Sequence, residues 1–93
     1  MQIGVMKIKL YAPWVHSLKE KRMVVKSIVT KIKNKFNVSA VEADEQDTHQ
    51  TIVIAMCSVF TNGMQPDSVW NNIINFIEDN TEAEITDVYR EIR

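Results

Sequence analysis

Hydrophobic and polar residues alternate at the start of the chain, before the pattern changes to a helical spacing. From Gln2 to Tyr11, the apolar residues Met6, Ile8 and Leu10 alternate with lysines. A period of two over this length predicts a β-strand with one buried side. Pro13 has no backbone donor for a central strand, so Ala12–His16 is predicted to be a connection.

A long helix is predicted to begin at Ser17. Ser17 and Glu20 have the spacing of a capping box, in which each side chain satisfies the backbone N–H of the other residue. The helix is predicted to end between Asn34 and Asn37, where lysines suit the negative end of its dipole. The apolar residues that recur at helical spacing form one stripe: Leu18, Val25, Ile28, Val29, Ile32 and Phe36.

The second half of the chain predicts three strands and one helix. The uninterrupted apolar run rich in β-branched residues is typical of a buried central strand, and a proline suits the first turn of a helix. The segments are a short strand at Val38–Ala43, a polar loop at Asp44–Gln50, a central strand at Thr51–Phe60, a turn at Thr61–Gly63, a helix from Pro66 to Asn80 and a charged edge strand at Ala83–Ile92.

The resulting order, β-α-β-β-α-β, predicts an α+β fold of ferredoxin-like type. One four-stranded antiparallel sheet carries both helices on the same face, because the crossovers are right-handed. The first and third strands are expected to be central. The length of 93 residues suits a single domain over residues 1–93.

Composition predicts a cytoplasmic protein. Cys57 is the one cysteine, so an internal disulfide is excluded, whereas small domains from oxidising compartments are usually stapled. The alternating first residues do not resemble a signal peptide, and no apolar run reaches the ~20 residues that span a bilayer. We therefore expect no membrane partner.

Charge is distributed unevenly along the chain, although the net charge is only −1. The segment His16–Phe36 holds seven bases and one acid, while residues 37–93 hold eleven acids and two bases. Such asymmetry is a hint of an anionic partner for the first helix. The plainer interpretation is a lysine-rich face that only keeps the protein soluble.

The start of this helix is the segment that best suits chemistry, because its free N–H groups and dipole attract anions. On a helical projection, four cations fall within an arc of about 60° beside the apolar stripe. We predict a phosphate- or RNA-binding set of Lys19, Lys21, Arg22, Lys26 and Lys33, and a candidate site at the helix start formed by His16, Ser17 and Glu20.

The other groups of polar and aromatic residues do not predict a functional site. His16, His49 and Cys57 lack the spacing of metal ligands, so no metal is expected. The acids of the 44–50 loop are typical of a solvated hairpin tip. The central strand has no aromatic residue for base stacking of the kind that RNA-recognition motifs use. Neither a catalytic residue nor a cofactor is predicted.

The uncovered sheet face is predicted to form a homodimer or to bind another partner. The strand at 51–60 is apolar on both sides, whereas a strand with one wet side would alternate with polar residues. Two helices cover one face, and an exposed apolar patch usually marks an interface. The predicted dimer face consists of Val53, Ala55, Cys57 and Val59.

The run from His16 to Arg22, His-Ser-Leu-Lys-Glu-Lys-Arg, resembles the most distinctive motif of the YlxP-like family, a bacterial domain of unknown function. The segments Lys35–Val38 and Glu45–Gln50 resemble it as well, so the likeness covers the whole chain. It implies a ferredoxin-like fold and no established activity. Because members are often encoded near translation initiation factor two and ribosome-binding factor A, it also suggests work around the ribosome.

Three functions therefore stay open. The favoured one is a non-enzymatic accessory protein that contacts rRNA or a ribosomal particle through the basic first helix. The rival is a protein-interaction or homodimerisation module in which the lysines only solubilise. The least favoured is an enzyme that acts on a small phosphorylated ligand at the helix N-terminus.

Overall fold

The predicted order of elements is present in the structure, a computed structural model that describes residues 1–44 and 48–93. The first and third strands, the two helices and their bounds agree with the sequence pattern within one residue at each end. The elements are β1 Gln2–Tyr11, α1 Leu18–Lys35, β2 Ser39–Glu42, β3 Thr51–Phe60, α2 Pro66–Asn80 and β4 Glu84–Ile92.

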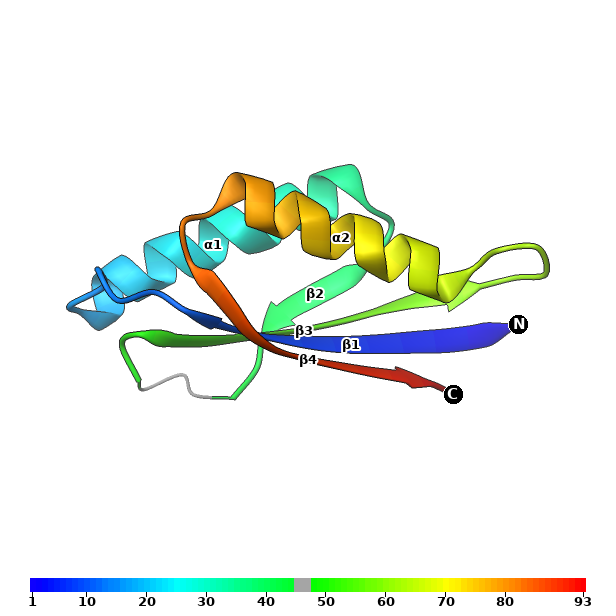
Figure 1. Ribbon diagram of the computed structural model, residues 1–93, viewed down its shortest axis with the longest axis horizontal. Helices are drawn as coiled ribbons and strands as arrows, with labels where there is room; N and C mark the ends of the chain where they lie inside the picture. The colour runs from blue at the N-terminus through cyan, green and yellow to red at the C-terminus, as the bar shows by residue number, and fades with distance from the viewer. Residues whose placement is uncertain (45–47) are drawn as a thin grey trace.

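The four strands form one antiparallel sheet in the order β2-β3-β1-β4, with the first and third strands central as predicted. Figure 1 shows α1 and α2 together on one side of this sheet, while no helix or strand of residues 1–44 and 48–93 covers its other side. The fold class is therefore confirmed as ferredoxin-like α+β. We call the uncovered side the open face.

The core lies between the sheet and the helices. In β1, Met6, Ile8 and Leu10 are fully buried and stand opposite apolar residues of β3 in register. The helices contribute Ile32 from α1 and Ile77 from α2, which are also fully buried. The alternation along β1 thus separates the residues that meet the helices from those on the open face.

A glycine in β1 allows the largest side chain of the core to approach the sheet. A Cβ atom at Gly4 would lie 2.5 Å from the Phe60 ring and 2.8 Å from the Trp70 ring. The two rings meet edge to face with centroids 5.5 Å apart. Gly4 is therefore required by packing, because any side chain there would overlap the aromatic pair.

Two differences from the sequence pattern are local. The short strand covers Ser39–Glu42 rather than 38–43, and the last strand begins at Glu84. Glu45, Gln46 and Asp47, which the loop prediction and the family resemblance included, lie outside the described residues.

Candidate nucleic-acid interface

Four cations lie along one side of α1, as the helical projection predicts. Lys19, Arg22, Lys26 and Lys33 are all exposed, and we call them the basic row. At 1.5 Å per residue the row extends over about 21 Å of helix. Within residues 1–44 and 48–93, none of the four forms an ion pair.

The packing of α1 turns the basic row away from α2. On the opposite flank of the helix, Val24 and Ile28 line a depression that the end of α2 completes. Further along that flank, the Lys35 Nζ lies 5.1 Å from the centroid of the Phe76 ring. At 100° per residue, the basic row is on the other flank. It therefore faces solvent, on the side of the molecule where α1 contacts β2.

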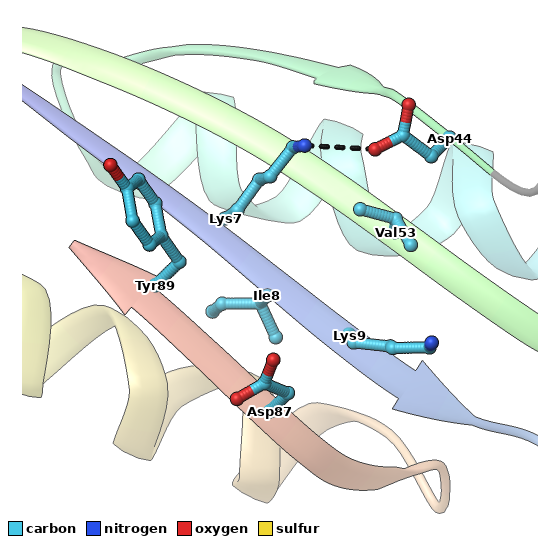
Figure 2. Close-up of a pocket in the computed structure, with 7 residues that line it drawn as sticks. All are labelled: Lys7, Ile8, Lys9, Asp44, Val53, Asp87 and Tyr89. Carbon is cyan, nitrogen blue, oxygen red and sulfur yellow. Dashed lines mark hydrogen bonds and ion pairs between the residues drawn. The ribbon is translucent and has the colours of Figure 1, made fainter. Parts of the chain in front are cut away.

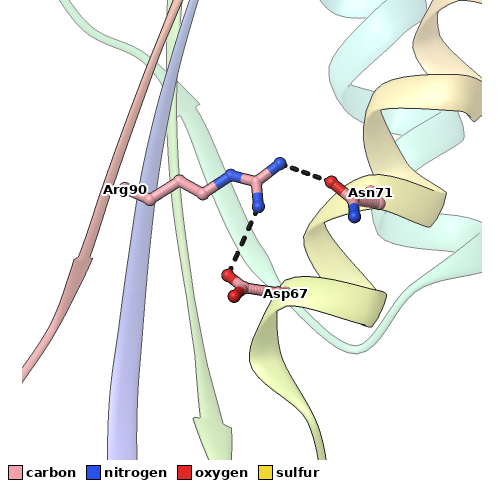
Figure 3. Close-up of polar contacts among 3 residues, drawn as sticks. All are labelled: Asp67, Asn71 and Arg90. Carbon is pink, nitrogen blue, oxygen red and sulfur yellow. Dashed lines mark hydrogen bonds and ion pairs between the residues drawn. The ribbon is translucent and has the colours of Figure 1, made fainter.

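Three cations outside α1, namely Lys7, Arg90 and Arg93, have carboxylate partners. Arg90 of β4 reaches across to α2, where it donates to the Asp67 carboxylate at 3.3 Å and to the side-chain amide oxygen of Asn71 at 2.6 Å (Figure 3). Two further ion pairs hold cations on the open face, namely Lys7 with Asp44 and Arg93 with Glu91. The basic row thus differs from these cations in having no carboxylate partner among the described residues.

Lys21 corrects the predicted phosphate-binding set. Its side chain is buried, with 1% of the residue exposed, and points into the protein instead of joining the row. The Nζ donates to the Thr48 carbonyl oxygen at 2.6 Å and lies 3.3 Å from a carboxylate oxygen of Glu42. Including Lys21 was wrong, because a lysine buried against Glu42 and Thr48 cannot reach an external phosphate.

The sequence contained a signal for this burial. Lys21 lies four residues before Val25 and seven before Ile28, both of which are buried. A residue at these spacings shares their helix face, so position 21 belongs to the core side. The prediction counted Lys21 by its charge and not by its place on the helix.

At the helix start, two of the three predicted residues act as caps. The Ser17 Oγ accepts from the Glu20 backbone N–H at 3.1 Å, as a capping box requires. The reciprocal bond differs from expectation, because the Glu20 carboxylate accepts from the His16 N–H at 3.4 Å and not from Ser17. His16 is therefore joined to the start of α1 through its backbone.

The sequence comparisons agree with the motif at this helix start. A family profile described as "Protein of unknown function (DUF503)" matches residues 3–90 of the chain. The chain belongs to the DUF503 family. It is also 40% identical over 70 residues to the "Uncharacterized protein YlxP" of Bacillus subtilis (strain 168), covering 75% of this chain and 76% of that protein.

In this DUF503 member, folding brings the two histidines to one place. His16 and His49 line the same depression, of about 490 Å³, together with Tyr11, Thr48 and Thr51. No pattern in the sequence indicates that residues so far apart along the chain lie together. Cys57 lies six residues beyond Thr51 on β3, about 20 Å away. The described residues contain no group of three side chains suited to a metal.

Hydrogen bonds to backbone carbonyl oxygens hold the loops that carry the two histidines. The Ala12 N–H donates to the Gln50 carbonyl oxygen at 2.8 Å, and the Gln50 side chain donates to the Pro13 carbonyl oxygen at 2.9 Å. Lys21 adds its bond to Thr48 from the other side. The depression therefore sits between segments held by three separate hydrogen bonds.

The predicted dimer residues all belong to the open face, although they differ in exposure. Val59 is 53% exposed and Cys57 is exposed, while Ala55 is half-buried. Val53 is 7% exposed, because it lines a depression of about 200 Å³ with Lys7 and neighbouring charged side chains. Val53 therefore offers little surface to a partner.

Figure 2 shows the charged side chains around this depression. The Lys7 Nζ lies 2.8 Å from the Asp44 carboxylate, with Tyr89 and Asp87 from β4 on the other side. The hydrogen bond from Lys7 lowers the pKa of Asp44 below its usual value.

Among the described residues, neither helix is long and apolar enough to span a membrane.

Proposed function

We propose that the protein is a non-enzymatic accessory protein that binds RNA, free or in a ribosomal particle, through the basic row of α1. One observation carries the proposal: four exposed cations without ion pairs among the described residues lie in one row along α1. The other exposed cations without an ion pair there, Lys9, Lys31 and Lys35, lie outside this row. A cation without a carboxylate partner keeps its attraction for an external anion.

The arrangement of the row suits a polyanion better than a single small ligand. Four cations spread over about 21 Å cannot surround one phosphate group, but they can each contact a different phosphate along a strand. Contacts of this kind depend on backbone charge and not on base identity, so we expect little sequence preference. RNA is proposed as the nucleic acid because the YlxP-like resemblance implies work around the ribosome.

The proposal is tested with a labelled single-stranded RNA of mixed sequence and fluorescence anisotropy. The variant Lys19→Gln/Arg22→Gln/Lys26→Gln removes three cations of the row. At about 0.5–1 kcal/mol for each exposed contact, binding should weaken by about 10- to 150-fold. The matched control, Lys9→Gln/Lys31→Gln/Lys35→Gln, removes the same charge away from the row and should lose much less.

Equal losses in the two triple variants would show that only net charge matters and would contradict an interface on the row. Co-sedimentation of the tagged protein with ribosomal subunits, at low and then moderate salt, identifies the source of the RNA. Binding to subunits that the row variant loses and the control retains is the expected result.

A further inference from the structure

The open face exposes apolar side chains on three neighbouring strands. Val41 of β2 is 58% exposed, Val59 of β3 is 53% exposed and Ile3 of β1 is 41% exposed. They lie beside Cys57 and Val5, with which they form a continuous patch across the sheet. A contiguous apolar patch on a small protein usually marks an interaction site.

Polarity on this face divides along the strands. At one end, Ile3 stands opposite Val59 and Val5 stands opposite Cys57, so this end is apolar on both central strands. At the other end β1 carries Lys9, whose neighbour on β4 is Asp87. The open face therefore changes from apolar at one end of the strands to charged at the other end.

The charges on the open face are largely neutralised within the chain. Lys7 pairs with Asp44, and Glu91 accepts from both Arg93 at 3.1 Å and the Tyr89 hydroxyl at 3.0 Å. The bond from Arg93 lowers the pKa of Glu91, while that carboxylate raises the pKa of Tyr89. With its charges paired, this face has little field to attract a nucleic acid or another highly charged partner.

We infer that the open face packs against the open face of a second copy of this chain, with a two-fold axis parallel to the strands between β3 and β1. This axis places β3 over β1 and β2 over β4 of the other copy. Residues that are paired across the sheet stay at the same height along the strands. Val59 then meets Ile3, Cys57 meets Val5 and Val41 meets Tyr89.

The arrangement is favoured because it makes the face self-complementary. The apolar end of one copy lies on the apolar end of the other, and the charged end, where Lys9 extends to the rim, lies on the charged end. An axis across the middle of the strands would instead place the apolar end on the charged end. Two aligned sheets that pack in this way form a sandwich with a core about 10 Å thick.

The size of the face suits a weak dimer. The strands have 10, 4, 10 and 9 residues. At about 4.8 Å between strands and about 3.3 Å per residue, they cover roughly 520 Å² per copy. The total of roughly 1,050 Å² is close to the smallest area, about 1,000 Å², of a specific interface. We therefore expect dimerisation that depends on concentration.

Light scattering over a wide concentration range tests the inference with the full chain. The wild type should pass from monomer to dimer, and Val59→Asp should remain a monomer with unchanged melting, because this residue is half exposed. Met23→Asp is the matched control, since Met23 is 66% exposed on α1 and lies away from the sheet. It should dimerise as the wild type does.

The natural Cys57 reports the orientation. With the axis between β3 and β1, the two Cys57 side chains lie at the same level and only about one strand spacing apart, so a short bis-maleimide should link them. Dimers that form in Val59→Asp and are not linked through Cys57 would place the interface elsewhere and overturn the inference. A wild type that stays monomeric at every concentration would also overturn it.

Discussion

The two sides of α1 carry the same kind of residue in opposite circumstances. Lys21, on the side turned to the sheet, is sealed against Glu42 and the Thr48 carbonyl oxygen, while its neighbour Arg22 is exposed and without an ion pair among the described residues. One cation holds the fold together and the other is free to meet an anion. The position on the helix, and not the charge itself, decides which role a basic residue has.

The largest expected effect concerns the buried side. Lys21→Ala should lower the free energy of unfolding by about 3–5 kcal/mol, because it leaves the Glu42 carboxylate in a largely buried place without its cation. Lys26→Ala, on the exposed side of the same helix, should change it by less than about 0.5 kcal/mol. Urea unfolding of the two variants measures the contrast directly.

A double variant separates the ion pair from simple loss of volume. In Lys21→Met/Glu42→Gln both charges are absent. Its loss of unfolding free energy should therefore be clearly smaller than the sum of the losses in Lys21→Met and in Glu42→Gln. Additive losses would mean that Lys21 and Glu42 act independently and that the buried pair does not hold α1 to β2.

The helix start gives an intermediate effect. Ser17→Ala removes the oxygen that accepts from the Glu20 N–H and should cost about 1 kcal/mol. Glu20→Ala should cost less, since its bond to the His16 N–H is long at 3.4 Å. Thermal melting of both single variants and of the double variant measures the coupling, and an unchanged Ser17→Ala would place the true cap elsewhere.

The smallest effect is expected on the open face, where the Lys7–Asp44 pair is exposed. Lys7 lowers the pKa of Asp44 in the folded protein from its ordinary 3.8. The carboxylate therefore stabilises the fold above the ordinary pKa, and this contribution is lost as the pH falls through the lower folded value. The stability difference between wild type and Asp44→Asn should shrink as the pH falls below the ordinary value of 3.8, as followed by urea unfolding. A constant difference would contradict this.

The sequence pattern predicts most of the fold because the elements are long and strongly periodic. The β1 and β3 bounds, the capped start of α1 and the two central strands follow from alternation, helical spacing and turn residues. Short β2 is less well placed at its ends, since four residues give too little periodicity. Local patterns are informative wherever buried residues recur at regular spacing several times within one element.

The candidate site is predicted less completely, because tertiary contacts determine it. The basic row follows from helical spacing, but the burial of Lys21 depends on Glu42 and the 44–50 loop, which only folding brings near. The placement of His16 and His49 around one depression also depends on the loops at one end of the sheet. Val53 is less exposed than the predicted dimer face requires for a similar reason, because charged side chains from other segments surround it.

The salt dependence of RNA affinity tests the central claim most directly. If all four cations of the basic row contact phosphates, a plot of log affinity against log salt for single-stranded RNA should have a slope of about −3. The variant Lys19→Gln/Arg22→Gln/Lys26→Gln, with one cation left in the row, should have a slope of about −0.7. A flat wild-type plot, or equal slopes for the two proteins, would contradict the assignment of the basic row as the RNA-binding surface.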